Sequence, residues 1–341
     1  MKRNILLILM LLFGKLLMAQ FGTGGEPSTI FDELSYDEVV DLSIEVDLEA
    51  LCANYRDDTK HKAVLTFDDK SGEQQFWPIK LQLRGKFRRM HCAEIPPLKL
   101  YFDKEDLKLG GFAEYNDFKI VNYCLADKEA ARELLLKEYM AYKIYNELAT
   151  ESFRVQLLRI TYRDIKSGRK TKQLAIMIED TGLLKKRINA HKFQKPEIYQ
   201  QSMFDMEQVQ TMALFQYMIG NTDWQLNLEK NIKILEQDRY YIVVPYDFDF
   251  SGLVNPPYGI PNSKFNRASL LDRVYLGFKD TTHEMEVVID QFRTKQPAIY
   301  ELIKSNKQLR AISKKEMLGY LDTFYDGLSI ETVTGTAKIS E

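Results

Sequence analysis

The chain has few cysteines, and they are widely spaced. Only Cys52, Cys92 and Cys124 occur among 341 residues. No two of them lie close enough in sequence for the paired pattern of a structural zinc site, so their spacing offers no support for a zinc cluster. An odd number allows at most one internal disulfide. We expect it between Cys92 and Cys124 in an oxidising compartment, and three buried thiols are the alternative.

An excess of charge of one sign is also lacking. The chain has 47 Lys and Arg residues against 49 Asp and Glu residues, for a formal net charge of -2 at pH 7. The positive residues are scattered among the negative ones and form no broad basic surface of the kind that a nucleic-acid backbone requires. We therefore expect no nucleic-acid partner.

A phosphate-binding loop of the common type is missing as well. Glycines cluster in residues 22–25, but no strand precedes them and no Gly-Lys-Ser/Thr follows. The cluster is better interpreted as part of a flexible leader over residues 20–29.

No apolar run is long enough to cross a membrane. The N-terminus begins with Lys2 and Arg3, continues with apolar residues 5–13, and reaches Ala19 after an interruption at Lys15. Because a span needs about 20 apolar residues, this order is typical of a secretory signal rather than of an anchor, which is the alternative. We expect cleavage of residues 1–19, no stable membrane insertion of the mature protein, and a periplasmic or secreted location.

Hydrophobic periodicity divides the rest of the chain into two parts. Apolar and polar residues alternate in residues 39–46, 63–67 and 79–83, which predicts strands with one solvent-facing side. A helix is predicted over 128–148, followed by strands over 153–162 and 174–178. The second part is predicted to contain a helix from about residue 207, a polar loop, strands over 232–235 and 240–244, and mostly helix over 269–328.

Polar residues suited to phosphate chemistry follow the helix that begins near residue 207. Asp223 lies in the polar loop, Asn231 opens the next strand, and Asp247 and Asp249 follow that strand's hairpin partner. The hairpin should bring both clusters to one end. Phosphoryl transfer needs a carboxylate to orient the acceptor hydroxyl, together with an amide and a carboxylate for magnesium. Asp223, Asn231 and Asp247 supply these three groups.

Four stretches of the chain carry a resemblance to a known family. They are Arg84-Gly85 with the strand 97–102, the strand 176–180, Asn221-Thr222-Asp223 with Asn231, and Pro245-Tyr246-Asp247-Phe248-Asp249. In their order and spacing they resemble the CotH kinase-like family. The resemblance implies an α+β, bilobal protein-kinase-like fold. Residues 30–180 would form a strand-rich N-lobe with one main helix, and residues 181–341 a helix-rich C-lobe.

The resemblance also implies roles for individual residues. Asp223 would be the catalytic base, and Asn231, Asp247 and Asp249 would hold the metal, Mg²⁺ or Mn²⁺. The residues implied in binding the cofactor, ATP, are Lys99, Arg84, Glu138 and Glu179, with Glu138 preferred over Glu133 as the partner of Lys99. The partner would be a protein with Ser or Thr hydroxyls. The chain departs from protein kinases because Asn231 lies eight residues after Asp223 rather than five and because no glycine-rich loop is visible.

Two other classes of function stay open at this point. A kinase-like domain can persist as a non-catalytic binding or scaffold module. A hydrolase with paired carboxylates at Asp247 and Asp249 fits less well, because no partner that activates water is evident. Asp223 alone could also be a turn-forming residue, which is the commoner use of a single loop aspartate.

Overall fold

The computed structural model describes residues 26–53, 58–85, 95–123, 125–278 and 282–335. The expected signal peptide and most of the leader lie outside these ranges, as do Cys92 and Cys124 of the expected disulfide. Within them, no helix is both long enough and apolar enough to span a membrane.

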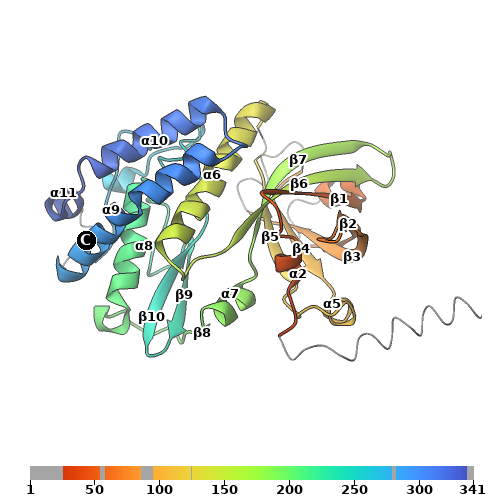
Figure 1. The fold of residues 1–341 in the computed structure, drawn as a ribbon, viewed down its shortest axis with the longest axis horizontal. Helices are drawn as coiled ribbons and strands as arrows, with labels where there is room; N and C mark the ends of the chain where they lie inside the picture. The colour runs from red at the N-terminus through yellow and green to blue at the C-terminus, as the bar shows by residue number, and fades with distance from the viewer. Residues whose placement is uncertain (1–25, 54–57, 86–94, 124, 279–281, 336–341) are drawn as a thin grey trace, which may run out of the picture.

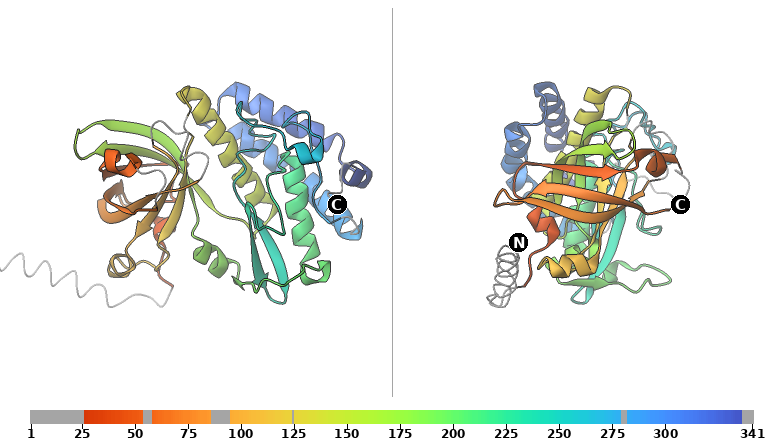
Figure 2. Two further views of the ribbon diagram at one scale, coloured as in Figure 1. Left: turned by 180° about the vertical axis from the view of Figure 1, so that it is seen from behind. Right: turned by 90° about the vertical axis from the view of Figure 1, so that its right-hand side faces the viewer.

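Seven strands of the first part close into a barrel (Figures 1 and 2). They are β1 (Val39–Val46), β2 (His61–Asp68), β3 (Gln74–Leu83), β4 (Leu98–Phe102), β5 (Asp117–Val121), β6 (Val155–Asp164) and β7 (Lys170–Ile178). Their order around the barrel is β1-β2-β3-β4-β5-β7-β6. β1 and β6 complete the ring as a parallel pair, from Val39 opposite Leu157 to Val46 opposite Asp164, while the other neighbours are antiparallel.

The barrel overturns the expected bilobal kinase-like fold, whose N-lobe sheet is open. The alternation of apolar residues correctly predicts the strands, because every second side chain is buried in the barrel core, as with Ile44, Leu65 and Leu81. Alternation does not state which strands pair, however. The parallel pairing of β1 with β6 joins segments on either side of a long helix, and it removes both sheet edges.

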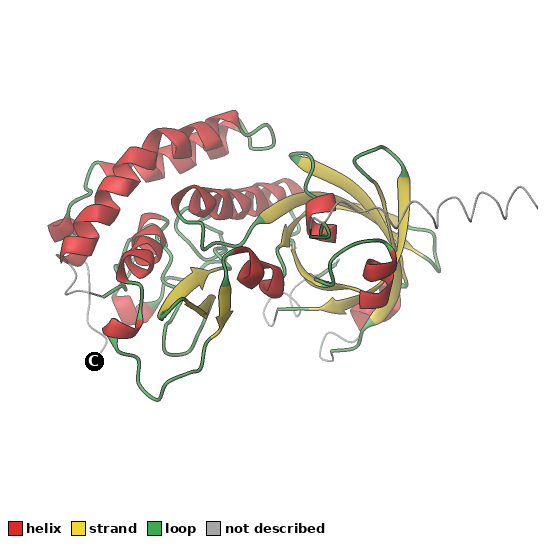
Figure 3. Cartoon of the chain, turned by 60° about the horizontal axis from the view of Figure 1, so that its bottom comes forward, coloured by secondary structure: helices red, strands yellow, loops and turns green. Residues whose placement is uncertain are grey.

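That long helix, α6 (Lys128–Leu148), has the predicted bounds and begins where the Asp127 side chain accepts hydrogen bonds from the amides of Glu129 and Ala130. Its buried residues form one core with α8 (Met206–Met218), α9 (Thr282–Ser305) and α10 (Ala311–Tyr325). The single helix expected to belong to the strand-rich lobe therefore packs with the helices of the second part, as Figures 1 and 3 show.

A second, smaller sheet lies beside these helices. Its order is β10-β9-β8, with β8 at Ala190–Lys192, β9 at Ile232–Gln237 and β10 at Tyr240–Pro245. The predicted hairpin is confirmed, since Gln237 lies opposite Tyr240 and Ile232 opposite Pro245. The remaining helices are short: α2 (Ile30–Glu33), α3 (Leu48–Ala53), α5 (Lys104–Leu109), α7 (Thr181–Arg187), α11 (Ile330–Gly335) and the 3₁₀ turns η1 (Gln201–Met203) and η2 (Ser263–Phe265).

Candidate functional site

The loop after α8 holds Asp223 through a chain of side-chain contacts. Gly220, with φ of 65°, reverses the chain beyond the helix. The Asn221 side chain then donates to Gln216 Oε1 at 2.9 Å and accepts from the Asp223 amide at 2.9 Å. Asn221 is fully buried, so this Asx turn anchors Asp223 to the end of α8.

Asn231 binds Asp223 directly. Its Nδ2 donates to the Asp223 carbonyl oxygen at 2.7 Å and to Oδ2 at 2.9 Å. Since the amide nitrogen is engaged in this way, the amide oxygen is the atom of Asn231 that can bind a metal. Lys230, the preceding residue, forms an ion pair with Asp223 Oδ1.

Asp247 joins the same site through the hairpin. The Tyr246 amide donates to the Asn231 carbonyl at 3.0 Å, which places Asp247 one residue beyond Asn231 on the paired strand. The Asp247 amide donates to Tyr142 Oη of α6 at 2.8 Å. These contacts join Asp223 to Asn231 and place the backbone of Asp247 at the same end of the hairpin, while the roles of the three residues stay predictions.

Both metal-ligand candidates have an unusual backbone. Asn231 has φ of 54° and Asp247 has φ of 67°, in the left-handed region that non-glycine residues seldom adopt. Asn and Asp adopt this region more often than other non-glycine residues, and Asn189, Glu229, Asp238, Asn255 and Asn266 also adopt it, so it does not by itself single out the site. Phe248, fully buried with its ring 4.6 Å from that of Tyr142, anchors the chain immediately after Asp247.

Several positive side chains of the barrel and the hairpin lie around Lys119, close to Tyr246. Lys119 of β5 has its Nζ 4.2 Å from the centre of the Tyr246 ring, and Lys233 of β9 lies 5.8 Å from the same ring. Burial lowers the pKa of Lys119 to about 7, and the positive charges of Arg84, Lys233 and Lys99 contribute, while Asp247 opposes the shift. We call Arg84, Lys99, Lys119 and Lys233 the cationic cluster.

Two members of this cluster were predicted, and two were missed. Lys99 on β4 lies opposite Lys119 and forms an ion pair with Asp117 at 3.1 Å. Burial alone would lower the pKa of Lys99, but Asp117 and Tyr101 raise it overall. Asp117 lies on the same strand as Lys119 but is ion-paired with Lys99, whereas the charge of Asp247 acts on Lys119. The sequence pattern that could have indicated Lys119 is its position two residues after Asp117, since alternate residues of a strand lie on the same face.

Glu138 and Glu133 of α6 have different surroundings. Glu138 is fully buried, and after burial itself it is the main cause, with Asp247, of the raised pKa of Tyr142. It therefore lies on the side of α6 that faces the site. Glu133 instead accepts from Ser313 Oγ at 2.6 Å and from the Arg310 amide at 3.2 Å. Glu138 was preferred over Glu133 as the partner of Lys99, and that pairing stays a prediction: Glu138 lies nearer the site, while the ion pair described for Lys99 is with Asp117.

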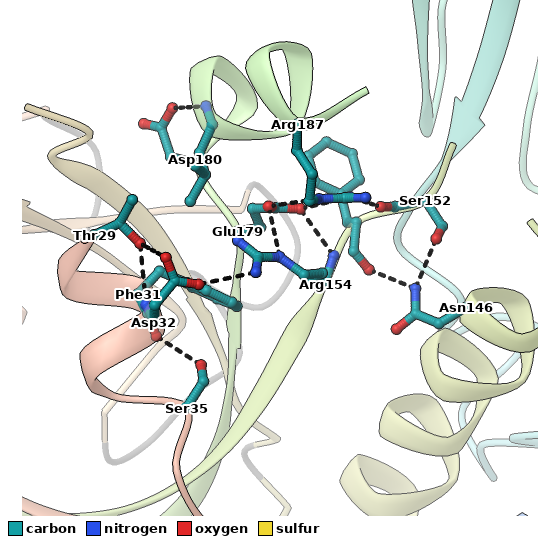
Figure 4. A network of polar contacts seen from close by, with 12 residues as sticks. Thr29, Phe31, Asp32, Ser35, Asn146, Ser152, Arg154, Glu179, Asp180 and Arg187 are labelled. Atoms are coloured by element: carbon teal, nitrogen blue, oxygen red, sulfur yellow. Dashed lines mark hydrogen bonds and ion pairs between the residues drawn. The ribbon is translucent and has the colours of Figure 1, made fainter. Parts of the chain in front are cut away.

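Glu179 is held by ion pairs within the protein. Its side chain is fully buried between two arginines: Oε1 accepts from Arg154 Nε at 2.8 Å, and Oε2 accepts from Arg187 Nη2 at 3.0 Å. Arg154 continues to Asp32 of α2 at 2.9 Å. Figure 4 shows this network linking the ends of β6 and β7 to α2 and α7. Both carboxylate oxygens of Glu179 are thereby engaged by the protein itself.

The site offers few side-chain ligands for a hard cation. Among the described residues, no group of three or more His, Cys, Asp or Glu side chains is arranged to hold a metal. Asn231 and Asp247 would supply two oxygens, and phosphate oxygens and water would have to complete the octahedron that Mg²⁺ requires. Asp249 is buried two residues further on. No protein-family model matches the chain, and no curated protein matches it.

Proposed function

We propose that this protein binds ATP with Mg²⁺ or Mn²⁺ at this site and transfers the terminal phosphate to a Ser or Thr hydroxyl of a protein. The cationic cluster is the observation that carries the proposal. Burial lowers the pKa of Lys119, and the positive charges of Arg84, Lys233 and Lys99 lower it further, so this arrangement is costly unless an anion is bound. A triphosphate offers the required charge.

The position of Asn231 and Asp247 favours a metal-bound phosphate over other anions. Both residues lie at the end of the hairpin from which Lys233 projects, so a cation held by their oxygens would be next to phosphates held by Lys119 and Lys233. Mg²⁺ is commonly bound by one or two protein oxygens plus substrate phosphates. The resemblance to CotH-type kinases supports the same chemistry, whereas the barrel lends it no support from the fold.

The proposed step needs little covalent help. Asp223 orients the acceptor hydroxyl and accepts its proton as the hydroxyl oxygen attacks the terminal phosphorus. The bond between that phosphorus and the bridging oxygen breaks, and ADP leaves with the electron pair. Lys119 and Arg84 would stabilise the charge on the phosphate oxygens in fixed positions. We place this activity outside the cytoplasm, in agreement with the expected signal peptide.

The ion pair of Asp223 with Lys230 favours one alternative, a module that binds nucleotide without transferring phosphate. A carboxylate held by Lys230 and Asn231 has fewer lone pairs for an acceptor hydroxyl. Measurement of phosphate transfer separates the two functions.

Isothermal titration with Mg²⁺-ATP and transfer of labelled phosphate test the proposal on three variants. Asp247→Asn should weaken metal-dependent ATP binding by about 10-fold or more, because it removes a charged ligand. Asp223→Asn should leave that affinity within about threefold and reduce transfer, since Asp223 acts mainly in the transition state. Asp238→Asn, in the turn at the far end of the hairpin, is the control. Undiminished affinity in Asp247→Asn would refute the metal assignment, and binding without transfer by the parent would establish the alternative.

A further inference from the structure

The two loops that carry the site residues are joined to each other behind the site. The Gly252 amide, in the turn after Asp249, donates to the Gly220 carbonyl at 3.3 Å, and the Leu253 amide donates to the Ile219 carbonyl at 3.0 Å. The loop of Asp223 and the turn that follows Asp247 therefore share one short stretch of backbone pairing. The distance between the acceptor-binding and metal-binding groups depends on this junction.

Arg267 is inserted into the junction. Its Nη1 donates to Thr222 Oγ1 at 2.7 Å, one residue before Asp223, and its Nη2 donates to the Gly220 carbonyl at 3.2 Å and to the Leu270 carbonyl. The Gly220 carbonyl thus accepts from both Gly252 and Arg267. The guanidinium group connects the segment after the metal-binding turn to the residue next to Asp223.

The environment of Arg267 is expensive for a positive charge. The side chain is buried, all three of its acceptors are neutral oxygens, and Nε has no hydrogen-bond partner among the described residues. Burial lowers the pKa of Arg267. A buried cation of this kind is weak evidence for stability, because an apolar side chain of similar volume would avoid the desolvation cost. Its five donors in a planar fork suit it instead to fix two backbone segments at once.

We propose that Arg267 is a positioning residue that holds the Asp223 loop in register with the metal-binding turn, a role that rests on the function proposed above. Thr222 and Gly220 accept hydrogen bonds from the guanidinium group, and the Asn221 side chain between them accepts one from the Asp223 amide. The restraint on this segment therefore extends to Asp223. Arg267 touches neither substrate nor metal in this arrangement. Its loss should displace Asp223 while leaving Asp247 and the cationic cluster in place.

Arg273 offers a matched control. It follows in the same segment, is partly buried, and also bonds to carbonyls, namely Met218 at 3.0 Å and Tyr320 at 2.6 Å. These contacts join the end of α8 to α10 rather than to the Asp223 loop. Methionine keeps most of the length of either arginine and removes every donor, so Arg267→Met and Arg273→Met differ mainly in which backbone they release.

Hydrogen exchange measured by mass spectrometry, Mg²⁺-ATP titration and phosphate transfer should be compared for the two variants and the parent. In Arg267→Met we expect faster amide exchange in residues 222–231 and transfer reduced about 10- to 100-fold, since small misplacements cost that much. ATP affinity should change less than about threefold. Arg273→Met should leave exchange in 222–231 and the transfer rate near those of the parent.

Three outcomes would overturn the role of Arg267. They are unchanged exchange in residues 222–231 of a folded Arg267→Met protein, equal exchange increases in both variants, and a loss of ATP affinity as large as the loss of transfer. If Arg267→Met does not fold, Thr222→Val decides, because it removes only the acceptor of Nη1 and should raise exchange in the same segment. A parent that transfers no phosphate refutes the proposed reaction, while the exchange measurement still tests the position of Arg267.

Discussion

Replacing Lys119 by methionine should stabilise the protein and weaken its binding of ATP. Folding lowers the pKa of Lys119 from 10.5 to about 7. One pKa unit corresponds to about 1.4 kcal/mol, so charging this lysine in the folded state costs at most roughly 5 kcal/mol. The side chain is partly exposed, and solvent screens the neighbouring charges. We therefore expect a gain in the free energy of unfolding of about 2 to 3 kcal/mol for Lys119→Met.

The cost of charging Lys119 makes the free energy of unfolding depend on pH within a defined window. Below about pH 7 the folded protein carries the charged lysine and its full cost. Between about 7 and 10.5 the unfolded chain binds the proton more tightly than the folded protein does, so the stability of the parent rises with pH. The advantage of Lys119→Met should be largest near pH 6 and should vanish near pH 10.5.

Urea unfolding at several pH values measures this advantage, and titration with Mg²⁺-ATP measures the functional cost. Loss of a charge-assisted contact to phosphate should weaken binding by about 10- to 100-fold. Lys80→Met, at an exposed position of β3, should change neither quantity. A lower stability of Lys119→Met at pH 6, or a difference that does not depend on pH, would refute the burial argument. Unchanged ATP affinity would remove Lys119 from the site.

Two further substitutions test the framework around the site. Glu179→Gln should lower the free energy of unfolding by about 2 to 3 kcal/mol in urea titration, because two arginines lose a fully buried carboxylate. The partial exposure of the arginines limits this loss. Glu45→Gln, in the exposed pair with Arg163, should cost under about 0.5 kcal/mol in the same titration. Gly220→Ala should lower the free energy of unfolding by about 2 kcal/mol or more, because φ is positive at this position and the new methyl group would contact Tyr320 Oη. Tyr320→Phe should relieve part of that loss, which a double-mutant cycle measures. Equal losses in the Glu179 and Glu45 variants, or an additive Gly220 and Tyr320 cycle, would contradict these assignments.

The sequence predicted local structure far better than it predicted the fold. The helix over 128–148 and the hairpin of residues 232–245 are set by nearby residues: helix-forming side chains with the cap at Asp127, and two apolar runs around a polar turn. Closure of the barrel depends on β1 and β6, which lie far apart in sequence and have no local signal for each other. The expected bilobal kinase-like fold was wrong for that reason.

The same distinction explains which site residues were found. Asp223, Asn231 and Asp247 lie within one loop and one hairpin, so their meeting follows from local geometry. Lys119 reaches Tyr246 only because the outer face of β5 packs toward the hairpin, a long-range contact. Glu179 was expected at the cofactor, yet Arg154, just before β6, and Arg187 of α7 form ion pairs with its carboxylate. Arg267 gave no signal at all, since its partners are backbone oxygens and one hydroxyl.

The closed barrel bears on how the proposed site would work. Lys99 and Lys119 lie on barrel strands, whereas Asn231, Asp247 and Lys233 lie on the hairpin of the helical part. A barrel without open edges deforms less easily than an open sheet, so the spacing of Lys99 and Lys119 should be nearly constant. Any adjustment between the lysines and the metal ligands must then occur where the barrel joins the helices. Glu179 and its two arginines occupy one such connection, at the end of β7 and the start of α7. If the protein binds ATP as proposed, this network would act on binding through the separation of the two parts, and Glu179→Gln should weaken Mg²⁺-ATP binding, because the two arginines already engage both carboxylate oxygens of Glu179.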